Sequence, residues 1–289
     1  MDPSDPNAGQ PVGAYGLRLR GLEDARDLLL PAPPEWPTVR VGWCVGAPLS
    51  GPESLEDESA HVNFPSGTGR VEIDRRRAEA WFTLAKPAAA MEIVHPYFPL
   101  VAAIWARWLG WEALHAGAFV VDGQAWALLG DKGSGKSSTL ARLAMHGTHI
   151  LADDVLVLAN GVGLAGPRCV DLRVNAARHL GIGENIGTVG VRERWRVRTG
   201  TVAAEVPLRG WVHLQWGRDV SITPTPLAAR LRLLFGNRAL FVPPDDPRAL
   251  LSLAALPAWR LSRPRTLESV DEATQRLLGV ISAAAPPLL

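Results

Sequence analysis

The sequence predicts a mixed α/β fold that follows a β-rich N-terminal region. Between about residues 15 and 85, short segments alternate between apolar and polar residues, which is typical of half-buried strands. From about residue 111, strand-like apolar runs are mixed with segments of helical spacing, and a glycine-rich loop connects one such strand to a helix. We therefore divide the chain into a disordered tail (1–13), a β-rich region of unknown role (14–110) and an α/β domain (111–289).

The first 85 residues contain the expected strands of the N-terminal region. Residues 1–13 are polar and rich in proline and glycine, a composition typical of disorder. Strands are expected at 15–20 and 38–43, and a hairpin at 70–84 turns at Arg75–Arg77, which we interpret as a solvated turn without a ligand. The segment 47–68 is rich in turn-forming residues and predicts a surface loop.

A helix at 99–108 is expected to pack Leu100, Ile104 and Trp108 against the core. After it, strands at 114–121 and 125–129 flank Asp122-Gly123, a favoured two-residue hairpin turn. The remaining expected elements are a helix at 137–144, strands at 148–152, 155–158, 168–173, 195–198 and 211–216, and a helical C-terminal tail broken at Pro257 and Pro264.

The composition of the chain argues against nucleic-acid-binding and membrane proteins. The 289-residue chain has a net charge of +1, so no overall field favours nucleic acid or an acidic membrane as a partner. Its two cysteines, Cys44 and Cys169, lack metal-ligand spacing and suit a reducing compartment. The first residues lack the pattern of a signal peptide, and the longest apolar stretch, 98–109, is too short to span a bilayer. We expect a cytoplasmic protein that binds neither nucleic acid nor membrane, and homo-oligomer formation stays open.

Residues 130–137 read G-D-K-G-S-G-K-S and match the phosphate-loop pattern G-x4-G-K-[ST]. The glycines let successive backbone N–H groups face a polyphosphate, Lys136 can reach the outer phosphates, and the Ser137 hydroxyl can ligate Mg²⁺. The loop opens a helix, whose N-terminal dipole favours bound phosphate. The chain has only three lysines, and two of them lie in this loop. We predict a site for a nucleoside triphosphate and Mg²⁺ that consists of Gly130, Asp131, Lys132, Gly133, Ser134, Gly135, Lys136, Ser137 and Ser138.

Two adjacent carboxylates, Asp153 and Asp154, follow on the first strand after this helix. Such a pair is common in solvated turns, but a nearby phosphate loop favours a functional interpretation. Phosphoryl transfer needs a carboxylate that holds Mg²⁺, and a second carboxylate can take the proton of a hydroxyl acceptor. We assign Asp154 with Ser137 to the metal and Asp153 to the base, and the exchanged assignment stays open.

The loop, the segment 147–154 that ends in Ala-Asp-Asp, and Leu114-His115 upstream resemble the HPr kinase/phosphorylase family. Its kinases combine a Walker A loop with an "ADD" strand and an upstream "HG" histidine. The resemblance extends over residues 113–175. The small peptide serine kinases of ribosomal-peptide pathways are related to this family, and the chain resembles them as well. It implies a P-loop core related to phosphoenolpyruvate carboxykinase, ATP as the donor and a serine hydroxyl as the acceptor. Residues 111–289 would then be a nucleotide-binding catalytic domain.

Several positions depart from the family pattern. Ser138 replaces the family's glutamate, Ala116 replaces the glycine after the histidine, and residues 170–174 only echo the "EIRG" signature that is tied to phosphorolysis. The first 110 residues do not resemble the family's regulatory domain. Neither phosphorolysis nor the identity of the acceptor is therefore assigned.

Three further features have two interpretations each. His115 is either a hydrogen-bonded core histidine or the catalytic histidine that the resemblance implies. Asp171 and Arg173 lie on one face of a strand and form an ion pair or place an arginine at the transferred phosphate. The alternating arginines of 192–198 form a solvated face, which we favour, or contact an acidic or phosphorylated partner.

The sequence favours a kinase that moves the γ-phosphate of ATP to a hydroxyl, most readily the serine of a protein or peptide. A nucleotide-dependent binding or switch protein needs only one carboxylate for the metal, so the paired aspartates argue against it. A small-molecule kinase is the third hypothesis.

Overall fold

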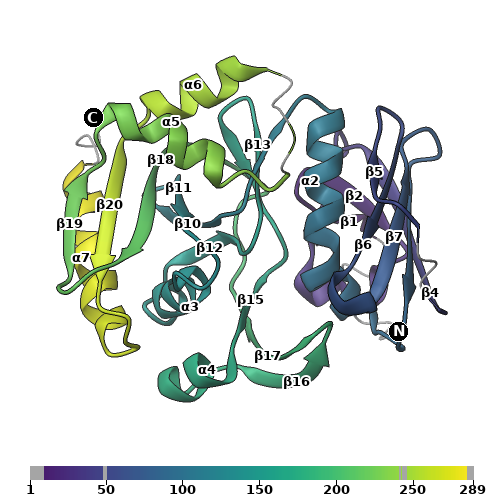
Figure 1. Ribbon diagram of the computed structural model, residues 1–289, viewed down its shortest axis with the longest axis horizontal. Coiled ribbons are helices and arrows are strands. Elements are labelled where there is room, and N and C mark those ends of the chain that lie inside the picture. Colours follow the sequence, from purple (N-terminus) through teal and green to yellow (C-terminus); the bar gives the residue numbers. More distant parts are fainter. Residues whose placement is uncertain (1–9, 48–50, 241, 243–245, 285–289) are drawn as a thin grey trace.

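The computed structural model describes residues 10–47, 51–240, 242 and 246–284. A mixed N-terminal sheet lies on one side of the molecule and a larger mixed sheet on the other, with helix α2 (Phe98–Trp108) between them (Figure 1). The predicted mixed α/β fold with a β-rich N-terminal region is confirmed. Residues 1–9 of the expected tail lie outside the described residues, and strand β1 (Val12–Ala14) shows that the tail ends earlier than expected.

The N-terminal sheet follows the alternating pattern of its sequence. Its other strands are β2 (Leu17–Arg20), β3 (Leu30–Pro31), β4 (Thr38–Val45), β5 (Ser54–Leu55), β6 (Ser59–Asn63), β7 (Gly69–Asp74) and β8 (Glu79–Leu84). In the described part of the chain the order is β3-β1-β2-β4-β8-β7-β6-β5. The predicted hairpin is present as the antiparallel pair β7–β8. The surface loop expected at 47–68 is wrong in part, because β6 pairs with β7 and gains backbone hydrogen bonds that local composition does not reveal.

The larger sheet carries the glycine-rich loop. Its strands are β9 (Glu112–Leu114), β10 (Gly117–Val121), β11 (Gln124–Leu129), β12 (His149–Ala152), β13 (Leu156–Ala159), β14 (Val162–Leu164), β18 (Glu205–Trp216), β19 (Ser221–Pro224) and β20 (Ala258–Arg263). They run in the order β12-β10-β11-β18-β14-β13-β9, and β20 pairs with β18 and β19. Strand β18 pairs in parallel with both β11 and β20. The prediction of a helical C-terminal tail is wrong for β19 and β20. Strand β20 forms because it can pair with β18 in parallel.

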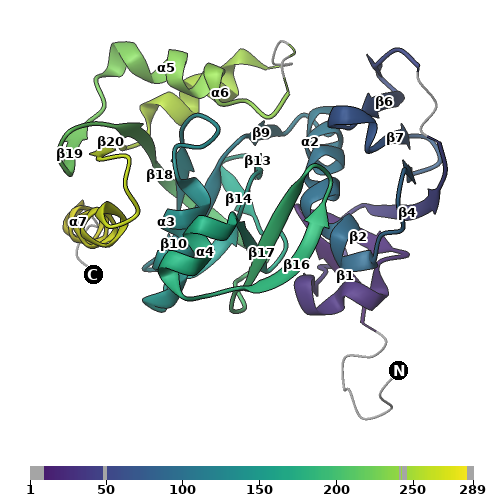
Figure 2. The same cartoon turned by 60° about the horizontal axis from the view of Figure 1, so that its bottom comes forward.

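A small third sheet projects from this domain. It consists of β15 (Cys169–Leu172), β16 (Glu184–Val189) and β17 (Arg192–Arg198), in the order β15-β17-β16. Figure 2 shows this sheet and helix α4 (Val174–Leu180) crossing the front of the molecule toward the N-terminal sheet. The other helices are α1 (Ala90–Glu92), α3 (Lys136–Met145), α5 (Leu227–Gly236), α6 (Pro247–Ala255) and α7 (Ser269–Ala284), with a π-helical segment at Ile93–Tyr97 and 3₁₀ segments at Glu23–Leu28 and Pro65–Gly67.

Helix α2 joins the two halves through their cores. As predicted, it buries Ile104 and Trp108, and Leu100 is partly buried. One hydrophobic cluster contains Phe82 of the N-terminal sheet, Ile104 of α2 and Leu156 of the larger sheet. Helices α3 and α7 cover the other face of the larger sheet in a second cluster. In the described part of the chain, no helix has both the length and the apolar composition that are needed to cross a membrane.

A buried ion pair ties the small sheet to the N-terminal half. The Arg196 side chain on β17 donates to both carboxylate oxygens of Asp171 on β15, at 2.8 and 3.0 Å. It also donates to the backbone carbonyls of Met91 and His95, at 2.9 and 2.6 Å. Both charged side chains are nearly inaccessible, with 4% and 1% of their surface exposed. Burial raises the pKa of Asp171, but His95 and Arg196 outweigh this effect and leave it lowered.

We predict that Asp171→Asn destabilises the protein by about 3–5 kcal/mol, because it leaves the Arg196 charge buried without its counter-ion. The free energy of unfolding in urea measures the effect. The matched control is Glu79→Gln, which removes the partner of Arg40 in an exposed pair and should cost less than about 1 kcal/mol. Equal costs for the two substitutions would contradict the structural role of Asp171.

Candidate active site at the glycine-rich loop

The glycine-rich loop connects β11 to α3 and has the backbone that its glycines predict. Gly130, Gly133 and Gly135 have φ values of 143°, 87° and 94°, which residues with side chains rarely adopt. A Cβ at Gly130 would lie 2.7 Å from the Ser134 hydroxyl, and one at Gly135 would lie 2.2 Å from the Arg263 guanidinium. The chain therefore needs glycine at these positions to form this turn.

Lys136 points back into the loop. Its ammonium donates to the Gly130 carbonyl at 2.5 Å and to the Asp131 carbonyl at 3.5 Å. Burial lowers the pKa of this lysine, and the charges of Asp154 and Asp153 oppose that shift. The Ser134 hydroxyl is buried without a hydrogen-bond partner. The loop thus encloses a cation and an unpaired hydroxyl, both of which suit a phosphate oxygen.

The acidic pair lies beside this loop, where β12 ends. Asp154 has a φ of 65° and lies between the two strands expected at 148–152 and 155–158, which form as β12 and β13. The Ser137 hydroxyl donates to Asp153 Oδ1 at 3.1 Å, and the amide of Asp171 donates to Asp153 Oδ2 at 3.3 Å. Asp153 is only 2% exposed. Burial, followed by the charges of Asp154 and Asp171, holds the pKa of Asp153 well above its usual range.

His115 lies between β9 and β10 and not on the single strand expected at 114–121. Its Nδ1 lies 3.0 Å from the Asp154 carbonyl and its Nε2 lies 3.1 Å from the Lys136 ammonium. Because a carbonyl only accepts, Nδ1 carries the proton and Nε2 accepts from Lys136. Burial and the Lys136 charge lower the pKa of His115, which favours this neutral form. His115 therefore connects the two predicted parts of the site.

Asp171 and Arg173 have different partners. Asp171 pairs with Arg196 and, at 3.4 Å, with Arg194, so the expected alternative of an Asp171–Arg173 ion pair is not what forms. Strand β15 ends at Leu172, so Arg173 is no longer on the strand. It directly precedes α4 and is exposed. The solvated face expected for the arginines of 192–198 is wrong for Arg194 and Arg196, which are 8% and 4% exposed.

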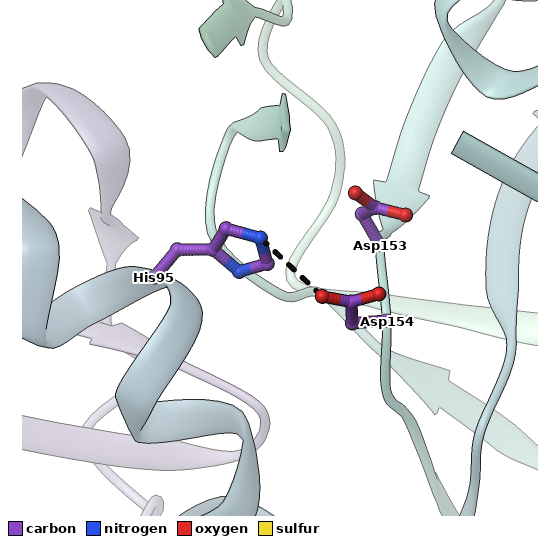
Figure 3. A group of neighbouring side chains, drawn as sticks. All are labelled: His95, Asp153 and Asp154. Carbon is purple, nitrogen blue, oxygen red and sulfur yellow. Dashed lines mark ion pairs between the residues drawn. The ribbon is translucent and has the colours of Figure 1, made fainter. Parts of the chain in front are cut away.

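Two residues at the site carry no sequence motif. Asn237, directly after α5, accepts from the Gly130 amide through its side chain at 3.0 Å, and its carbonyl accepts from the His115 amide at 2.7 Å. His95 comes from the N-terminal half and lies 3.7 Å from Asp154 Oδ2 (Figure 3). The only local signal for His95 is Pro96, because the residue before a proline avoids the helical conformation.

A cavity of about 610 Å³ opens between the N-terminal half, the small sheet with the start of α4, and Lys132 of the loop. Its apolar wall includes Phe64, Tyr97 and Leu100. Its basic wall is formed by Lys132, Arg173, Arg192 and Arg194. The cavity therefore offers apolar contact and positive charge beside the glycine-rich loop.

Comparisons with known proteins give a similarity at the level of structure. No protein-family model matches the chain, and none of the curated proteins matches it. Among solved structures, the chain is similar to the Hpr(Ser) kinase/phosphatase from Coxiella burnetii, with a TM-score of 0.31 and 12% identity over 60% of this chain and 99% of that chain. We base no functional argument on a similarity of this size.

We predict that Asp153→Asn stabilises the nucleotide-free protein after a chelator has removed metal ions. The folded-state pKa of Asp153 is raised, so its protonated form is stabilised by folding and this stability is lost as pH rises through the folded pKa. Calorimetric unfolding should show a gain of about 1 kcal/mol at pH 8 and a smaller gain at pH 5. The exposed Asp219→Asn should change stability by less than about 0.5 kcal/mol at both pH values. An Asp153→Asn variant that is less stable than wild type at pH 8 would refute the argument.

Proposed function

We propose that the chain is an ATP-dependent kinase that transfers the γ-phosphoryl group to a hydroxyl, with a serine of a protein or peptide as the acceptor. The observation that carries this proposal is the division between the two aspartates. Asp153 is buried and bonded to Ser137 of the loop, whereas the Asp154 side chain is 31% exposed and makes no bond to the loop. In a kinase, one carboxylate would hold the metal and the accessible second carboxylate would take the proton of the acceptor hydroxyl.

The nucleotide side of the site fits ATP with Mg²⁺. Lys136 would exchange its bonds to loop carbonyls for the β- and γ-phosphates, and the unpaired Ser134 hydroxyl offers a further donor. Ser137 and Asp153 would hold Mg²⁺, since their oxygens already lie together. This assignment exchanges the roles expected from the sequence, which paired Ser137 with Asp154. Bound Mg²⁺ would neutralise charge on the phosphate oxygens.

The acceptor side would use Asp154 as the general base. Its partial exposure leaves a carboxylate oxygen accessible to a hydroxyl, as a base requires. The neighbouring cavity could receive the segment around that hydroxyl. Lys132, Arg173 and Arg192 would favour acidic residues in the acceptor, and the apolar wall at Phe64 and Tyr97 would contact its side chains.

We predict that Lys136→Ala raises the dissociation constant of Mg²⁺–ATP about 10–100-fold, because it removes charge-assisted hydrogen bonds to the phosphates. Titration calorimetry measures this constant. Lys86→Ala is the matched control, since Lys86 is exposed in the N-terminal half and far from the loop in sequence. An unchanged affinity in Lys136→Ala would show that the phosphates bind elsewhere.

We also predict that Asp154→Asn lowers acceptor phosphorylation about 10²–10⁴-fold with little change in ATP affinity, as expected for the loss of a general base. Asp153→Asn should instead weaken Mg²⁺–ATP binding, because it removes a metal ligand. The measurement follows radiolabel from γ-labelled ATP into a panel of serine-containing proteins and peptides.

The same experiment separates the alternatives. Label that appears only as free phosphate, released equally by wild type and Asp154→Asn, would favour a nucleotide-dependent switch protein. Label in small hydroxyl compounds but in no peptide would favour a small-molecule kinase.

A further inference from the structure

His95 is held in an unusual position for a buried histidine. It has extended φ and ψ values of −153° and 122° inside the π-helical segment Ile93–Tyr97, because the following residue is Pro96. The residue is 1% exposed. Figure 3 shows its ring directed from the N-terminal half toward Asp154.

The imidazole has no hydrogen-bond partner at Nε2, although the atom is buried. The nearest carboxylate oxygens are Asp154 Oδ2 at 3.7 Å and Asp171 Oδ2 at 3.8 Å, which is too long for a hydrogen bond. An imidazole nitrogen that has no hydrogen-bond partner is free to bind a metal ion.

The two aspartates beside His95 also lack a cation. In the part of the chain that the structure describes, neither Asp153 nor Asp154 forms an ion pair with a lysine or arginine. Asp171, by contrast, is matched by Arg196 and Arg194. One donor atom each from His95, Asp153 and Asp154 lie within 4.8 Å of one another. These three side chains can therefore approach a single ion from different directions.

We propose that His95, Asp153 and Asp154 bind a divalent transition-metal ion, and that the chain binds it before nucleotide arrives. One imidazole nitrogen and two carboxylate oxygens suit ions such as Mn²⁺ or Zn²⁺ better than Mg²⁺, which prefers oxygen ligands alone. The proposal uses only side chains that the free protein already holds together, so it does not rest on the proposed kinase activity. A carboxylate has two oxygens, so a bound ion leaves the second oxygen of Asp154 for an acceptor.

This site gives the N-terminal half a chemical role. Arg196 donates to the backbone carbonyl of His95 itself and to that of Met91 on the preceding helical turn. The ligand from the N-terminal half is thus positioned by the ion pair of the small sheet, and the two aspartates directly follow β12 of the larger sheet.

The test measures binding of Mn²⁺ alone to chelator-treated, nucleotide-free protein, by titration calorimetry and by electron spin echo spectroscopy. We expect one bound Mn²⁺ whose spectrum shows coupling to an imidazole nitrogen. His95→Gln should lose this coupling and weaken binding by more than the ~10-fold that is typical of removing an outer-shell partner. His149→Gln, at an exposed histidine on β12, is the matched control and should behave like wild type.

Asp154→Asn provides a second variant that keeps His95 in place, in case His95→Gln fails to fold. It should weaken Mn²⁺ binding to a similar degree while circular dichroism stays unchanged. Mn²⁺ bound to wild type without nitrogen coupling, or with an affinity unchanged in folded His95→Gln, would overturn the proposal. ATP binding and radiolabel transfer are measured with Mg²⁺ on the same samples. These two assays test the kinase proposal independently of Mn²⁺ binding.

Discussion

The buried pair of Arg196 and Asp171 is the contact on which the arrangement of the site depends. A guanidinium with four bonds, two to a carboxylate and two to backbone carbonyls, fixes the relative position of β15, β17 and the segment before α2. Because both charges are inaccessible to water, loss of the Asp171 carboxylate would leave the Arg196 charge buried without its counter-ion. Separating the small sheet from the N-terminal half would therefore cost substantial free energy. The backbone amide of Asp171 in turn donates a hydrogen bond to Asp153, so the position of Asp171 also affects the acidic pair.

The candidate site contrasts with this matched pair. Asp153 and Asp154 adjoin each other without a lysine or arginine among their ion-pair partners in the described chain, and Lys136 is turned away toward loop carbonyls. Burial and like charge raise the pKa of Asp153. Such unfavourable electrostatics are typical of sites that await a charged ligand. A nucleotide would supply negative charge to Lys136, and cations would supply positive charge to the aspartates.

The N-terminal half completes the site and is not a separate module. It shares a hydrophobic cluster with the larger sheet, forms one wall of the cavity beside the loop, and contributes His95. The wall from this half contains Phe64 and Tyr97, whose rings lie 4.9 Å apart. Recognition of the proposed acceptor would therefore depend on both halves.

Features that depend on local backbone chemistry can be predicted from the amino-acid sequence. The glycines of 130–135 specify the turn that leads into α3, Asp122-Gly123 specifies the hairpin between β10 and β11, and the alternation in 70–84 specifies β7 and β8. Contacts between residues that are distant in sequence become visible only in the folded chain. Strand β20 forms because β18 provides a parallel edge. Arg194 and Arg196 are buried because a carboxylate and backbone carbonyls face them. His95 joins Asp153 and Asp154 because an ion pair elsewhere holds its backbone. Such long-range contacts leave no periodic pattern in the chain, since each partner is chosen by packing and charge and not by its neighbours in sequence.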